Sequence, residues 1–119
     1  MFLATLSISS AAAEWVKVGG DEDVTVYANP ASIRKAGHMV KTWLLSDYKT
    51  PDGLQYLSRK YQHEYDCKEE RFRTLYMAFH TGSMGEGTFD VMISEPVSWM
   101  PVPPDSTLEP LWQFACGKR

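Results

Sequence analysis

Residues 38–80 read HMVKTWLLSDYKTPDGLQYLSRKYQHEYDCKEERFRTLYMAFH, and this stretch decides the fold. Three segments in it are rich in aromatic and β-branched residues, as strands usually are: residues 38–49, 56–66 and 71–80. Thr50-Pro-Asp-Gly53 separates the first two, with proline early and glycine late as in a tight turn. The stretch therefore predicts three consecutive antiparallel strands.

The segment 56–66 divides into two faces because side chains alternate along a strand. Leu57, Tyr61 and Tyr65 share one parity with Arg59 and His63. The opposite parity is mostly polar and predicts a solvent-exposed face. Its members are Tyr56, Ser58, Lys60, Gln62, Glu64 and Asp66.

Working outward, shorter strands are expected on both sides of this stretch. Residues 14–20 alternate apolar and polar before a Gly-Gly break, and residues 24–28 are rich in valine and tyrosine. Residues 88–94 form the last expected strand, after a glycine-rich segment at 82–87. Because strands lie on both sides of that segment, it predicts a hairpin connection rather than a phosphate-binding loop.

A short helix is expected after the second strand. Asn29 is a suitable N-cap, and Pro30 suits the first helical position. Residues 31–36 leave room for about two turns, and Gly37 is a plausible left-handed stop.

The C-terminal segment predicts a second helix. Four prolines precede it and argue against regular strand pairing there: Pro96, Pro101, Pro103 and Pro104. An apolar stripe at helical spacing follows, with regular helix expected from Pro110 and an end at Gly117. The stripe comprises Leu108, Leu111, Trp112, Ala115 and Cys116. The fold class is thus α+β, with about six antiparallel strands and one face covered by this helix.

The first residues indicate export. Residues 1–13 are mostly apolar or small and end in Ala11-Ala-Ala13, typical of the final part of a signal peptide cleaved before Glu14. Residues 14–119 then form a single domain. In an oxidising compartment, Cys67 and Cys116 are expected to form a structural disulfide that fastens the helix to a strand end.

Composition excludes several classes of protein. The chain has 119 residues, 44% hydrophobic and 23% charged, which is ordinary for a folded domain. The net charge of −3 argues against a nucleic-acid binder that relies on a strongly basic field. No apolar run has the 18 or more residues of a membrane span.

No catalytic or metal constellation emerges. His63-Glu-Tyr-Asp-Cys67 gathers potential ligands but lacks the spacing of a zinc motif, and a bridged Cys67 cannot ligate. His38, His63 and His80 have no fixed spacing to a nucleophile. We therefore expect a non-enzyme without a cofactor or metal.

Aromatic and basic residues interleave in the sheet region, which allows two interpretations. They can build a mixed surface suited to protein contact. Alternatively, the aromatic residues fill the core and the basic ones only face solvent, which is the commoner outcome. On the first interpretation, the candidate binding residues are Tyr48, Tyr56, Arg59, Lys60 and Tyr61.

Several motifs together resemble the surface-adhesin protein E family of Gram-negative bacteria. They are Trp15-Val-Lys-Val-Gly19, Tyr27-Ala-Asn-Pro-Ala-Ser-Ile33, Glu64-Tyr-Asp-Cys67 with Glu70-Arg71, and the tail Trp112 to Cys116. The resemblance implies a small curved sheet joined to a C-terminal helix by a disulfide. It also implies a periplasmic or cell-surface location and, from the best-known member, binding of host matrix proteins and haem.

Two functional hypotheses follow. The first is an exported binding module that contacts a protein or other macromolecule through the sheet. The second is a small-ligand carrier that uses the groove between sheet and helix, with haem as the family-suggested ligand and His63 or His80 as candidate axial ligands. The oligomeric state is left open.

Overall fold

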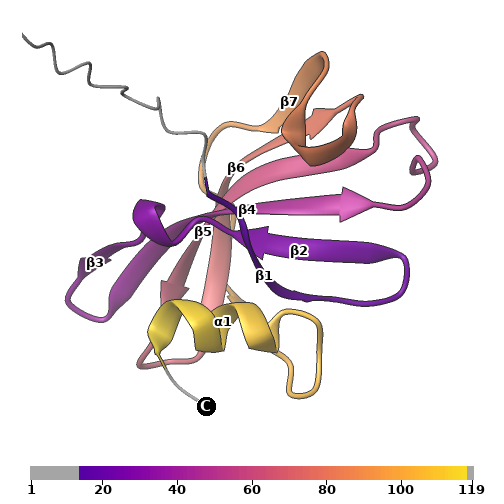
Figure 1. Ribbon diagram of the computed structural model, residues 1–119. Helices are drawn as coiled ribbons and strands as arrows, with labels where there is room; N and C mark the ends of the chain where they lie inside the picture. The colour runs from indigo at the N-terminus through magenta and orange to yellow at the C-terminus, as the bar shows by residue number, and fades with distance from the viewer. Residues whose placement is uncertain (1–13, 118–119) are drawn as a thin grey trace, which may run out of the picture.

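A computed structural model describes residues 14–117, so the expected signal segment 1–13 lies outside the described residues. The chain forms one sheet of eight strands with the order β1-β2-β4-β5-β6-β7, while β3 pairs with β4 and β8 pairs with β6 (Figure 1). All strand pairs are antiparallel. The first two strands are β1 (Val16–Gly20) and β2 (Val24–Ala28).

The three long central strands confirm the prediction from residues 38–80. They are β4 (Met39–Tyr48), β5 (Ser58–Asp66) and β6 (Arg71–His80). The register between β5 and β6 shifts between Gln62 and His63. Such a bulge bends the strand and increases its twist.

The expected short helix after β2 is wrong in its extent. Only one 3-10 turn forms, η1 (Pro30–Ser32), with Asn29 capping it by accepting a hydrogen bond from the Ala31 backbone N–H at 3.1 Å. Residues Arg34–Ala36 form strand β3 instead. Gly37 has φ 63° and begins the two-residue turn into β4, so it closes a hairpin rather than a helix. Pairing with β4 outweighs the weak helical preference of so short a segment.

The proline-rich segment also differs from the expectation. Strand β7 (Phe89–Ile93) follows the hairpin turn η2 (Ser83–Gly85), as predicted. Met100–Pro101 then forms a two-residue strand, β8, against the start of β6. Proline is tolerated at a sheet edge because it need not donate to the ladder. β3 and β8 account for the difference from about six strands.

Helix α1 (Glu109–Cys116) covers one side of the sheet at the end opposite β7 (Figure 1). Pro110 lies in its first turn, and Gly117 ends it in the left-handed conformation, as predicted. Its buried residues, Leu111, Trp112 and Ala115, pack into the core. The sheet contributes to that core Val26, Ala28, Val40, Leu44, Tyr61, Tyr65 and Phe72. We call this side of the sheet the helix face and the opposite side the outer face.

The predicted disulfide is present. Cys67 and Cys116 are joined with a Cα–Cα distance of 5.6 Å and a sequence separation of 49. Cys67 follows β5 directly, so the bond ties the last turn of α1 to a strand end.

The outer face of β5 is not the solvent-exposed surface that the sequence predicted. Ser58, Glu64 and Asp66 are all buried. The turn η2 covers Ser58, whose hydroxyl donates to the Gly82 carbonyl at 2.6 Å. Arginines of β6 pair with the two carboxylates. Polar partners from neighbouring segments replace water, which a single strand's pattern does not reveal.

Candidate functional site

The helix face carries a hollow of about 310 Å³ where the sheet meets the turn that leads into α1. We call it the helix-face hollow. Strands β4, β5 and β6 form its floor, and Thr107 and Leu108 form the wall beside the helix. The residues that line it are Ser46, Tyr48, Arg59, Tyr61, His63, Phe72, Met77, Thr107 and Leu108.

Arg59 lies between two aromatic rings in this region. Its guanidinium carbon is 4.2 Å from the ring centre of Phe79 and 5.3 Å from that of Tyr48. Nη2 forms a 3.4 Å ion pair with Asp52, while the buried Nε has no hydrogen-bond partner among residues 14–117. An unpaired buried N–H is energetically costly, so the guanidinium is not fully satisfied where it lies. The Arg59 side chain as a whole is 31% exposed, so its charge faces the hollow's surroundings.

The partner of Arg59 is held in its charged form. A hydrogen bond from the Tyr56 backbone N–H is the main cause that lowers the pKa of Asp52, with Arg59 adding to it. Burial raises the pKa of Tyr48, so its phenol is neutral at physiological pH.

The floor of the hollow is neutral. The Tyr61 and Ser46 hydroxyls are 2.7 Å apart, and burial raises the pKa of Tyr61 to about 12. His63 Nδ1 is 2.8 Å from the Tyr65 hydroxyl, and burial lowers the pKa of His63 to about 3. Of the described residues lining the hollow, Arg59 alone is charged at neutral pH. The site is therefore aromatic and apolar with one cation at its side.

The structure brings four of the sequence-predicted residues to this hollow: Tyr48, Arg59, Tyr61 and His63. Tyr56 lies nearby, with its ring centre 5.4 Å from that of Phe79 and its hydroxyl donating to Asp90.

Lys60 lies elsewhere. It pairs in register with Leu45 and Ala78 on the outer face, and its side chain runs beside Gly85 of η2.

His80 is also on the outer face. It pairs with Ser58 and its ring stacks on Phe89 at 5.1 Å. Burial is the largest cause that lowers the pKa of His80, and its buried Nδ1 has no hydrogen-bond partner in the described part of the chain. Because His63 lies on the helix face, these two histidines are on opposite sides of the sheet and cannot both contact one haem.

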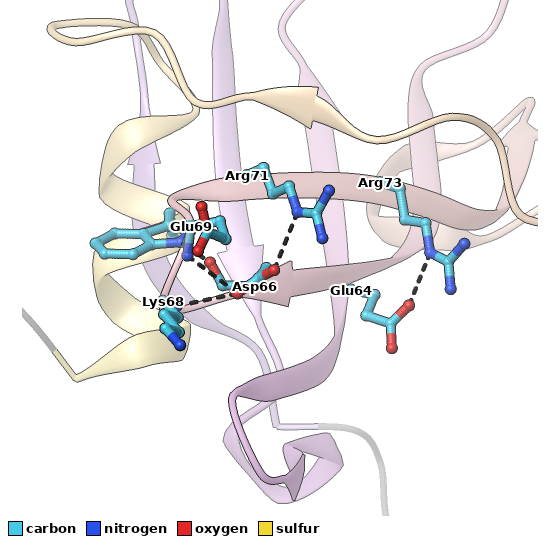
Figure 2. A network of polar contacts seen from close by, with 7 residues as sticks. Glu64, Asp66, Lys68, Glu69, Arg71 and Arg73 are labelled. Carbon is cyan, nitrogen blue, oxygen red and sulfur yellow. Dashed lines mark hydrogen bonds and ion pairs between the residues drawn. The ribbon is translucent and has the colours of Figure 1, made fainter.

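The ligand-rich segment at the end of β5 serves structure. Glu64 accepts from Arg73 Nε at 2.8 Å, and Asp66 accepts from Arg71 Nε at 3.0 Å (Figure 2). Cys67 is in the disulfide. Each potential ligand is thus engaged by another part of the protein.

Asp66 has a larger structural role than the sequence suggested. Its carboxylate also accepts hydrogen bonds from the Lys68 and Glu69 backbone N–H groups (Figure 2). Its backbone carbonyl accepts one from Trp112 Nε1 at 3.2 Å. Burial raises the pKa of Asp66, but these backbone hydrogen bonds and Arg71 outweigh it and lower the pKa overall. The sequence signal for this role is an aspartate at the start of a turn, because its side chain can accept hydrogen bonds from the backbone N–H groups two and three residues later.

Within residues 14–117, there is no cluster of three or more histidine, cysteine or acidic side chains arranged to hold a metal. In the same part of the chain, no helix has the length and apolar character needed to cross a membrane.

Comparisons with known proteins agree on one relationship. A sequence model described as surface-adhesin protein E matches residues 15–117. Among curated proteins, none matches significantly. Crystal form II of Haemophilus influenzae protein E superposes with a TM-score of 0.67 at 15% identity, covering 87% of each chain. Protein E from non-typeable Haemophilus influenzae superposes with a TM-score of 0.63 at 13% identity, and the match covers 92% of this chain and 79% of that one. At such identities the structural likeness concerns the fold.

Proposed function

Because the chain belongs to the surface-adhesin protein E family, we propose that it is an exported, non-enzymatic binding module whose helix-face hollow receives a side chain of a macromolecular partner. Residues 1–13 act as the end of a signal peptide in this proposal, and residues 14–119 as one domain at the periplasmic or outer surface. The observation that carries it is the gathering of Tyr48, Arg59, Tyr61 and His63 around one hollow.

The chemistry of the hollow suits an anchor side chain. Binding energy in protein interfaces concentrates where an aromatic or arginine residue meets a desolvated pocket. Here the neutral rings of Tyr61, His63 and Phe72 offer apolar contact. Arg59, whose side chain is 31% exposed, offers the charge of its guanidinium to a carbonyl or carboxylate of the partner.

The experiment is a biosensor panel of matrix and serum proteins tested against the mature full chain. Arg59→Ala and Tyr48→Ala are expected to weaken binding by tenfold or more. Lys17→Ala is the matched control because it removes one cation from an exposed position on β1, away from the hollow. Thermal melts confirm that each variant is folded.

Two results would count against the proposal. One is a panel that stays blank for the unaltered protein. The other is a partner whose affinity is equal for the Arg59→Ala, Tyr48→Ala and Lys17→Ala variants. Mass spectrometry of the exported protein checks the signal peptide, with Glu14 expected as the first residue.

The second candidate is a small-ligand carrier that uses the same hollow. It is favoured by the position of the hollow between the sheet and the turn before α1, with His63 in its floor. Titration with haemin is expected to give a Soret shift that His63→Ala abolishes and His80→Ala leaves intact. An unchanged haemin spectrum removes this alternative.

A further inference from the structure

A second site lies on the outer face, independent of the helix-face hollow. A groove of about 130 Å³ runs beside the β3–β4 hairpin and is lined by Arg34, Lys35, Ala36, Met39, Lys41 and Glu64. One row of side chains crosses four strands here, because Arg34 pairs with Lys41, Lys41 with Glu64, and Glu64 with Arg73. That row holds three cations and one carboxylate.

The single carboxylate is already used. Glu64 accepts from Arg73 at 2.8 Å, and Figure 2 shows this pair. Arg34 and Lys41 form no ion pair with any residue between 14 and 117. Both hydrogen bonds of the Arg34 guanidinium use Nη1 and go to the Ala31 and Ile33 carbonyls, each at 2.9 Å. These bonds fix the guanidinium in place and leave its other N–H groups for a ligand.

The row also has an unfavourable arrangement. Arg34 and Lys41 are directly opposite each other on neighbouring strands. Like charges at such positions destabilise the pair, and an anion bound between them would relieve that repulsion.

Aromatic side chains adjoin the cations. Trp43 lies two residues along β4 from Lys41 and therefore on the same face. Its ring meets Tyr76 edge-on at 5.3 Å, and Gln62 lies between them in register. All three are partly exposed. An aromatic surface with an amide beside it suits a sugar ring, which has an apolar C–H face and hydroxyl groups at its rim.

We propose that the outer-face groove and the adjoining Trp43–Tyr76 pair bind an acidic polysaccharide. Its sulfate or carboxylate groups occupy the groove between Arg34 and Lys41, and a neighbouring sugar ring stacks on Trp43. The contact lies on the opposite face from the helix-face hollow, so the two sites can be occupied together.

The test uses the mature full chain and a heparin-derived octasaccharide as the probe, measured by calorimetry at low and physiological salt. Arg34→Ala combined with Lys41→Ala is expected to lower the affinity by tenfold or more. Lys49→Ala combined with Lys68→Ala is the matched control, because it removes the same amount of charge from two turns elsewhere in the protein. This control is expected to change the affinity by twofold or less. Binding is expected to weaken as salt rises.

The aromatic contact has its own test. Trp43→Ala is expected to lower the affinity for the octasaccharide several-fold, and Trp43→Tyr is expected to restore most of that loss. Neither change should alter the affinity for inorganic tripolyphosphate, which has no ring to stack. Thermal melts verify that Trp43→Ala remains folded.

Four outcomes would overturn the proposal. The first is that the octasaccharide fails to bind at low salt. The second is that both double variants weaken octasaccharide binding equally. The third is that single-stranded DNA of equal charge binds as tightly as the octasaccharide and with the same dependence on Trp43. Loss of the probe through Arg59→Ala would also contradict it, because that residue belongs to the other site.

Discussion

The two faces of the sheet are built from the same three strands but are stabilised differently. The helix face buries apolar and aromatic side chains under α1 and is closed by the disulfide. The outer face buries carboxylates in ion pairs with Arg71 and Arg73. The guanidinium carbon of each arginine also lies 4.6 Å from the ring centre of Trp99. Apolar burial scales with area, whereas ion pairs gain little once desolvation is included. The difference indicates that the helix face supplies most of the stability.

The sharpest way to test this difference is to remove one tryptophan from each face. Trp112→Ala deletes a buried indole and its hydrogen bond to the Asp66 carbonyl, and should lower the free energy of unfolding by about 3–5 kcal/mol. Trp43→Ala, on the partly exposed outer face, should cost about 1 kcal/mol. Urea denaturation measures both. Equal losses would show that the two faces stabilise the fold alike.

The disulfide is the second largest expected contribution. Replacing Cys67 and Cys116 together by serine should lower the free energy of unfolding by about 2–4 kcal/mol, because the crosslink restricts the unfolded chain across a separation of 49 residues. Urea curves of the double variant and of the reduced unaltered protein are the measurement. Agreement between the two supports the interpretation, and a change below about 1 kcal/mol contradicts it.

Acid should weaken the helix face before the outer face. The pKa of folded His63 is about 3 against an ordinary value of 6.5, so below pH 6.5 the unfolded chain binds a proton that the folded one does not. The free energy of unfolding should therefore fall by up to about 1.4 kcal/mol per pH unit between these values.

Asp66 on the outer face has a lowered pKa, so the stability it supplies is lost only as pH falls below the ordinary value of 3.8. Urea midpoints measured from pH 7 to 3 check both expectations. His63→Gln should flatten the slope between pH 6.5 and 4, while the exposed control His38→Gln should not. A slope that His63→Gln leaves unchanged would assign the acid sensitivity to another group.

The smallest expected effect is on the outer face. Glu64→Gln removes the charge that pairs with Arg73, whose side chain is 30% exposed, and should cost about 0.2–1 kcal/mol. The urea midpoint measures it, with Glu70→Gln in the adjacent turn as the control. A loss comparable to that of Trp112→Ala would mean that ion pairs stabilise this sheet as much as the core does.

Much of the fold was predictable because its signals are local. Alternation set the long strands, and the spacing from Leu108 to Cys116 set the helix. The pairing of Cys67 with Cys116 needed only the inference of an oxidising compartment.

What the sequence did not reveal depends on neighbours. Arg34–Ala36 is a strand only because β4 lies beside it, and Glu64 is buried only because Arg73 covers it. The candidate site was likewise only partly predictable. Strand alternation places Arg59 and Tyr61 on one face of β5 and Lys60 on the opposite face. Thr107 and Leu108 complete the hollow through tertiary contact, which a strand pattern does not encode.

The segment from 94 to 104 has a further consequence for the growth of the sheet. Its prolines carry no N–H, and the N–H groups of Val97 and Val102 are spent inward on the Thr74 and Glu70 carbonyls. Another extended chain would find few donors along this border of β6. The segment therefore protects this border of the sheet against edge-to-edge pairing with another chain, which is a hazard at any open sheet edge.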